Sequence, residues 1–191
     1  MGILIDILGS TLIGGILLFL MLNMNLFISS AGYNSDNELR MQQNAKTIAE
    51  IINNDFRKIG YKQTGTAILN AESKRFKFVG DLERPGNPGY GIIDTLEYFI
   101  QDSSITNNSD NIILMRVLNN QDSIGGPSLG LFKLNFSYLD SLSSPTNDLT
   151  KIRYIKTEFW VKPVDQVNDF VTGKKDSVFT YWEFTIYPRN I

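Results

Sequence analysis

The stretch that decides the fold is residues 2–28, which read GILIDILGSTLIGGILLFLMLNMNLFI. One residue in this stretch is acidic, Asp6, and none is basic. A helix rises about 1.5 Å per residue and needs roughly 20 apolar residues to cross a bilayer. A buried core helix is the alternative, but such helices are seldom apolar on every face over this length. We therefore expect a membrane-spanning helix.

A cleaved secretory signal peptide is a second alternative for this segment. Such peptides begin with basic residues and end at a small-residue cleavage site, whereas the first basic residue here is Arg40. We expect the segment to be retained as a single span in the inner membrane. Too few basic residues flank the segment for the positive-inside rule to set its orientation. The large polar remainder nevertheless favours a C-terminal domain outside the cytoplasm.

Composition excludes several classes of function. The chain has 191 residues, a net charge of −2, and neither histidine nor cysteine. Catalytic systems built on histidine or cysteine are therefore excluded, as are the usual zinc sites. The charge gives no global attraction to nucleic acid. We expect no metal, no cofactor and no nucleic-acid partner.

Two pairs of small residues lie four positions apart in the apolar segment, Ser10 with Gly14 and Thr11 with Gly15. Such pairs let a second helix approach closely. Asp6 is costly in a membrane helix and is a candidate functional residue. It is placed either at the interface, solvated by water, or in an assembly, paired with a positive group of a partner.

An amphipathic segment follows. Ser35 and Glu38 fit a capping box, so the sequence predicts either a new helix or a long helix that is locally weakened at residues 29–37. Gly60 is a predicted C-terminal stop. Apolar residues at helical spacing predict the face that packs on the rest of the chain: Leu39, Ala45, Ile48, Ala49, Ile52, Phe56 and Ile59.

The pattern then changes to short apolar strands between polar turns. We expect an α+β fold in three segments: a membrane or filament-core helix (1–30), an amphipathic continuation helix (31–62), and an antiparallel β domain (63–191). Trp182, Phe184 and Ile186 are predicted to share one face with Val178. The predicted strands are 75–79, 92–100, 112–118, 129–139, 152–161 and 178–187.

Four stretches carry a family resemblance: NNDFRKIGY (53–61), DTLEYFI (94–100) with ILMR (113–116), LFKLNFSYLD (131–140), and IRYIKTEFWV (152–161) with PRNI (188–191). In this order and spacing, the chain resembles type IV pilins and pseudopilins, particularly the minor pilin W and pseudopilin J group. The resemblance covers nearly the whole chain. It implies a structural subunit, of the minor kind, of a type IV pilus-like filament or a type II secretion pseudopilus.

The resemblance also implies partners and a role for Asp6. The partners are other pilin-like subunits, the inner-membrane assembly machinery and the lipid bilayer, with the protein in the periplasm or at the cell surface once assembled. The family carries a basic leader and then Gly-Phe-Thr-Leu-x-Glu, which this sequence lacks. If only Met1 is removed, Asp6 becomes the fifth residue, where the family has its glutamate. Asp6 would then pair with the N-terminal amine of a neighbour and set the axial register.

Two other functions stay open at this point. The chain is alternatively a single-span envelope protein whose β domain binds a partner and does not polymerise. A hydrolase would need paired carboxylates, one of them with a raised pKa in a cleft. The loop from Asp102 to Asn111 lacks the residue order of a calcium loop. The candidate carboxylate pairs are Asp94 with Glu97, Asp165 with Asp169, and Glu158 with Glu183.

Overall fold

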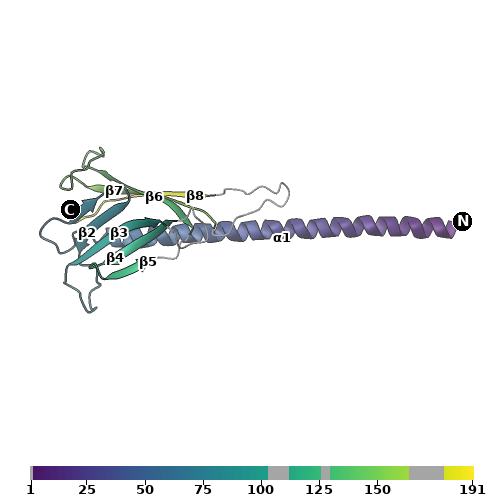
Figure 1. Ribbon diagram of the computed structural model, residues 1–191, viewed down its shortest axis with the longest axis horizontal. Helices are drawn as coiled ribbons and strands as arrows, with labels where there is room; N and C mark the ends of the chain where they lie inside the picture. The colour runs from purple at the N-terminus through teal and green to yellow at the C-terminus, as the bar shows by residue number, and fades with distance from the viewer. Residues whose placement is uncertain (1, 103–111, 126–129, 164–178) are drawn as a thin grey trace.

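The computed structural model describes residues 2–102, 112–125, 130–163 and 179–191. The N-terminal helix α1 (Gly2–Phe56) extends far beyond the β domain, which surrounds its C-terminal end (Figure 1). This is the predicted α+β fold. The strands of the domain are β1 (Ile68–Ala71), β2 (Arg75–Gly80), β3 (Asp94–Asp102), β4 (Ile112–Leu118), β5 (Asp122–Gly125), β6 (Leu131–Leu139), β7 (Tyr154–Val161) and β8 (Thr180–Ile186).

Helix α1 is continuous through residues 29–37, so of the two alternatives predicted for this stretch, a new helix start at Ser35 is wrong and one long helix is correct. The polar residues of this stretch are accommodated within the helix. The Ser30 hydroxyl donates to the carbonyl of Phe27 at 2.9 Å, and Arg40 pairs with Asp36 one turn away at 2.8 Å. Hydroxyls bonded to a preceding carbonyl, and ion pairs four residues apart, are both compatible with a helix.

The helix ends at Phe56, three residues before the predicted end at Ile59. Hydrogen bonds between residues three apart follow, as in a 3₁₀-helix. The amide of Lys58 donates to the carbonyl of Asp55, and the amide of Ile59 donates to the carbonyl of Phe56. Gly60 then has a φ of +71°, a left-handed conformation that glycine adopts at low cost. The regular helix thus ends four residues before the predicted stop, and Gly60 lies in the turn that follows it.

Two antiparallel sheets enclose the end of the helix. One has the strand order β1-β2-β3-β4-β5 and the other β6-β7-β8. The strands β1 and β5, which are each four residues long, are absent from the strands predicted from the sequence. Three residues, Asn119 to Gln121, connect β4 to β5. Asn119 and Asn120 have φ values of 52° and 59°, the left-handed conformation that asparagine tolerates in tight turns.

An irregularity in β6 changes which side chains face the core. The pairing of β6 with β7 shifts register between Leu131 and Lys133. Leu131 is consequently buried with Leu134 and Phe136, and Phe132 is only partly buried. Strict alternation within 129–139 predicts that Leu131 and Lys133 lie on the face opposite to Phe132, Leu134 and Phe136, and this prediction is wrong at the start of the strand. A β-bulge of this kind cannot be predicted from a strict two-residue alternation of apolar and polar side chains.

One hydrophobic core joins the helix to both sheets. Phe56 lies at its centre, with ring centroids 5.0 Å from Phe76 and 5.8 Å from both Tyr98 and Phe136. Leu39 is 55% exposed and does not belong to the core face, which is a correction to the predicted pattern. The buried helix residues are Asn37, Met41, Ala45, Ile48, Ile52, Asp55 and Phe56.

Candidate assembly surfaces

The apolar half of α1 lies outside the core. Its large side chains are exposed along the whole segment, with Met21 at 75% and Ile28 at 57%. An 18-residue window of α1 has a mean hydropathy of 2.3, and none of that window is buried. By length and composition, this helix is able to cross a membrane. A surface this apolar requires lipid or other helices to cover it.

The small polar residues of this segment lie on the exposed surface of the helix. Ser10 and Thr11 donate to helix carbonyls 2.8 and 3.0 Å away, so their hydroxyls are satisfied within the chain. A Cβ added at Gly14 or Gly15 would meet nothing within 4 Å. Within the described part of the chain, Asp6 has no ion-pair partner. These positions are therefore open to a second molecule.

Residues from two of the sequence stretches that carry the family resemblance meet between the helix and the larger sheet. Asp55, near the end of α1, is 4% exposed. Its carboxylate accepts hydrogen bonds from the Tyr98 hydroxyl of β3 at 2.5 Å and from Arg116 Nε of β4 at 2.7 Å. Burial raises the pKa of Tyr98 well above its ordinary value, and the charge of Asp55 raises it further. The phenol thus stays protonated and donates to the carboxylate.

The C-terminal residues pack against the turn that follows α1. A Cβ at Gly60 would lie 2.3 Å from the carbonyl oxygen of Asn190. Only glycine allows this approach, because Gly60 lacks a side chain and has a positive φ. The contact fixes the last residues beside the end of the helix, and it therefore positions Arg189.

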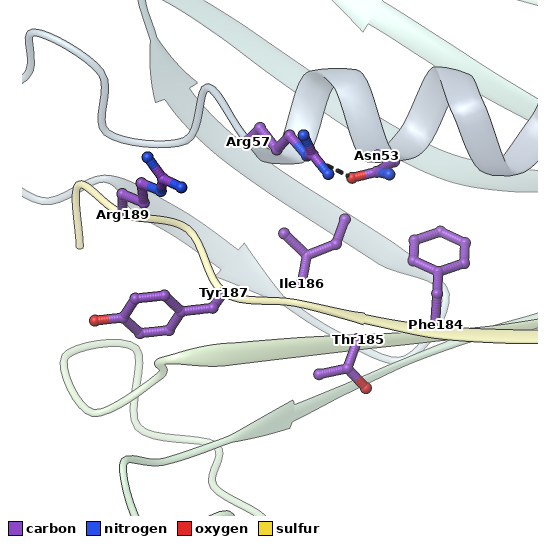
Figure 2. A pocket seen from close by; sticks show the side chains of 7 residues that line it. All are labelled: Asn53, Arg57, Phe184, Thr185, Ile186, Tyr187 and Arg189. Carbon is purple, nitrogen blue, oxygen red and sulfur yellow. Dashed lines mark hydrogen bonds between the residues drawn. The ribbon is translucent and has the colours of Figure 1, made fainter.

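A groove of about 500 Å³ lies between the end of α1 and the end of β8. Figure 2 shows the side chains of Arg57 and Arg189 entering the same space. The Nε of Arg57 donates to the Oδ1 of Asn53 at 3.0 Å. No hydrogen bond or ion pair of Arg189 is present among the described residues. The full lining is Asn53, Arg57, Phe184, Thr185, Ile186, Tyr187 and Arg189.

Both arginines lie within the stretches that carry the family resemblance, but nothing in those stretches predicts a role for either. They are far apart in the chain, and the approach of the C-terminus to Gly60 is what brings them together. The contact joins a glycine after the helix to a short polar C-terminus, and neither segment has a periodic pattern from which the contact could be predicted. Only the tertiary structure reveals this groove.

The predicted carboxylate pairs have different surroundings. Glu97 is 5% exposed and pairs with Arg75 and, at 3.4 Å, with Lys77. Asp94 accepts a hydrogen bond from the Asn119 side chain at 2.8 Å. Each carboxylate therefore has its own partner. The pair Asp165–Asp169 and most of the loop at 102–111 lie outside the described residues.

Glu158 and Glu183 lie directly opposite each other on β7 and β8, as predicted. Partial burial opposes the charge of Glu158, but hydrogen bonds from Lys156 and Tyr181 lower its pKa below the ordinary value. The hydrogen bond from Tyr181, followed by that from Lys156, lowers the pKa of Glu183. Both shifts are opposite to the raised pKa that the hydrolase hypothesis requires. Among the described residues, no group of three acidic side chains is placed to hold a metal ion.

No protein-family model matches this chain. No curated protein matches it either. Among solved structures, it is similar to a type IV-like pilin from Thermus thermophilus, with a TM-score of 0.51 and 11% sequence identity. The match covers 79% of this chain and 97% of that one. At this identity the likeness concerns the fold, and the chain thus has the α+β fold of a type IV-like pilin.

Proposed function

We propose that this protein is a structural subunit of a type IV pilus-like filament or of a type II secretion pseudopilus, without enzymatic activity of its own. The observation that carries the proposal is the unbroken helix α1, apolar and exposed at one end and buried in the β domain at the other. The resemblance to the pilin W and pseudopilin J group supports a minor subunit.

The exposed segment supplies the energy for assembly. Covering one Leu, Ile or Phe side chain contributes about 1.5–3 kcal/mol, and residues 2–28 expose many such side chains. In the inner membrane, lipid covers them; in a filament, the helices of other pilin-like subunits replace the lipid. Residues 1–30 would form this filament core, and the inner-membrane machinery would move the subunit from one environment to the other. The β domain would lie outside the cytoplasm, in the periplasm or at the cell surface.

Asp6, Ser10, Gly14 and Gly15 would guide this packing. The two glycines present backbone without a side chain to a neighbouring helix, which permits close approach. The carboxylate of Asp6 would pair with the N-terminal amine of a neighbour. Such a pair is strongly destabilising to break once it is buried, so it would fix the axial register between subunits.

Substitution of Asp6 tests the proposal. Asp6→Ala should reduce the amount of protein in the sheared filament fraction while leaving the amount in the membrane unchanged. Glu38→Ala is the matched control, because Glu38 is an exposed acid on the same helix, lies beyond the apolar segment, and has no ion pair among the described residues. Normal filament incorporation of Asp6→Ala would contradict the proposed register.

A single-span envelope protein that binds a partner but does not polymerise is the alternative. In that case, the unaltered protein would remain in the membrane fraction and be absent from filaments. N-terminal sequencing of the filament protein adds a second check. We expect Gly2 to be its first residue, which places Asp6 fifth.

A further inference from the structure

We propose that the free edge of β8 binds an extended acidic segment of a different protein, which adds to the smaller sheet as a fourth strand and places a carboxylate between Arg57 and Arg189. The site is the groove between β8 and the end of α1 (Figure 2). This inference goes beyond the filament function, because the edge is available to a partner both in the membrane and in a filament.

The edge of β8 is open. The sheet order β6-β7-β8 gives β8 a neighbouring strand on one side only. Among the described residues, no backbone hydrogen bond joins β8 to any element other than β7. An edge strand of this kind presents unpaired N–H and C=O groups to an added strand.

The usual protection of an edge strand is missing from β8. Proteins block such edges with proline, with lysine or with a β-bulge. β8 contains neither proline nor lysine, and its register with β7 has no irregularity. Its one charged residue, Glu183, pairs with Lys156 of β7 at 3.1 Å, which holds this carboxylate towards the neighbouring strand. The backbone of β8 is thus left accessible to another chain.

The groove follows this open edge. Four consecutive residues, Phe184 to Tyr187, line it. Successive side chains of a strand point to opposite faces of the sheet, so a space that touches all four runs along the backbone between the two faces. Asn53 and Arg57, four residues apart on α1, form the opposite wall. A peptide in the groove would therefore lie parallel to the backbone of β8.

The charge of the groove selects an acidic segment. Arg57 and Arg189 reach it, and neither forms an ion pair within the described residues (Figure 2). Arg57 uses its Nε to bind Asn53, which orients the guanidinium group. The remaining N–H donors match the two oxygens of a carboxylate. Backbone pairing would supply affinity and the two arginines would supply specificity, as in other cases of strand addition.

A lipid headgroup and a nucleic acid fit this site less well. Arg57 lies 29 residues beyond Ile28, the end of the apolar segment, which places it about 43 Å further along a continuous helix. A membrane spanned by that segment therefore leaves the groove far above the headgroups. A nucleic acid would meet the exposed carboxylate of Glu183 on the same strand, in a chain whose net charge is −2. Copies of a minor subunit are seldom neighbours, so the segment belongs to a different protein.

A synthetic peptide tests the charge selection. The probe is a short fluorescent peptide of alternating serine and valine with one central glutamate, and its anisotropy is measured with the full-length protein in detergent. The same peptide with glutamine in place of glutamate should bind about tenfold more weakly. Arg57→Gln and Arg189→Gln should each remove most of this difference. Lys46→Gln is the matched control, because Lys46 is an exposed cation of α1 outside the groove, and it should change neither affinity.

N-methylation of the probe tests strand addition itself. Only alternate amides of an added strand face the edge that it joins. Of two glutamate peptides, methylated on the odd or on the even residues, one should bind within about twofold of the parent and the other at least about tenfold more weakly. Equal binding of both would mean that the peptide is held by charge alone, and would overturn the fourth strand.

The remaining outcomes are also decisive. No binding at about 1 mM peptide, or equal binding of the glutamate and glutamine peptides, would overturn the site. Tighter binding of a short single-stranded oligonucleotide than of the glutamate peptide would assign the groove to nucleic acid and overturn the proposal. The filament fractionation of the Asp6→Ala protein is a separate measurement. Its failure would leave the peptide result intact, and failure of the peptide to bind would leave the filament function intact.

Discussion

Replacement of Asp55 by alanine should lower the free energy of unfolding of the β domain by about 3 kcal/mol. Asp55 is 4% exposed and Tyr98 is 1% exposed, so the substitution leaves the Tyr98 hydroxyl unsatisfied, at a cost of about 1–3 kcal/mol. It also leaves Arg116 without its counter-charge. Removal of one partner from a fully buried pair costs about 3–5 kcal/mol. The Arg116 side chain keeps 23% exposure, and its access to water places the expected loss at the low end.

Denaturant unfolding of the full-length protein in detergent measures this change. Trp182 is a suitable fluorescence probe, because it stacks on buried Phe159 at a centroid distance of 6.4 Å. For a chain of this size, the loss corresponds to a fall in melting temperature of about 6–12 °C. Tyr98→Phe should cost less, about 1–2 kcal/mol, because the ion pair remains.

A double-mutant cycle decides whether the ion pair is responsible. Asp55→Ala, Arg116→Ala and the double variant together give the coupling energy of the pair. We expect about 1.5–3 kcal/mol, as for hydrogen bonds between charged groups. A coupling below about 0.5 kcal/mol would refute the reasoning, and would mean that Asp55 acts through packing alone.

Three further predictions concern the end of the helix and the adjoining loop. Gly60→Ala should cost about 2–3 kcal/mol in chemical unfolding, because its Cβ would lie 2.3 Å from a carbonyl oxygen at a φ of +71°. Gly86→Ala, where φ is +94° and no atom lies within 4 Å, should show backbone strain alone. Phe56→Ala should cost about 3–5 kcal/mol in the same assay; a loss below 1 kcal/mol would contradict its central place in the core. A hydrogen bond from Lys62 lowers the pKa of Asp81, so this carboxylate stabilises the fold above its ordinary pKa of about 3.9 and loses that effect as the pH falls through the lowered value. Lys62→Met should therefore flatten the acid dependence of unfolding below about pH 4, and an unchanged dependence would argue against this ion pair.

The elements that follow a regular period could be predicted from the sequence. The apolar segment and the buried positions Ala45, Ile48, Ile52 and Phe56 were found because a long helix repeats its contacts every three to four residues. The strand β4 was predicted with its observed bounds. Trp182, Phe184 and Ile186 lie on one face of β8 as expected, and Val178 lies outside the described residues.

The features that depend on distant residues could not be predicted. Asp55 and Arg116 are 61 residues apart, and each resembles an ordinary surface charge in its own segment. The bulge in β6 depends on how β7 pairs with it. The possible capping box at Ser35 left a new helix start and one long helix as alternatives, because capping rules take no account of the hydrogen bonds and ion pairs that keep the helix intact there. The assembly surface proposed on the helix therefore follows from the sequence, whereas the groove is apparent only from the fold.

The continuity of α1 has a mechanical consequence. A flexible joint at residues 29–37 would let the β domain swivel, so that tension on the apolar segment would peel its contacts apart one at a time. An unbroken helix transmits that tension along its axis into the domain. The core around Phe56 and the ion pair of Asp55 with Arg116 then resist that tension at the same time, because the force acts parallel to the surface between the helix and the sheets. Extraction from a membrane would therefore pull on the domain in the direction in which its contacts must yield at the same time.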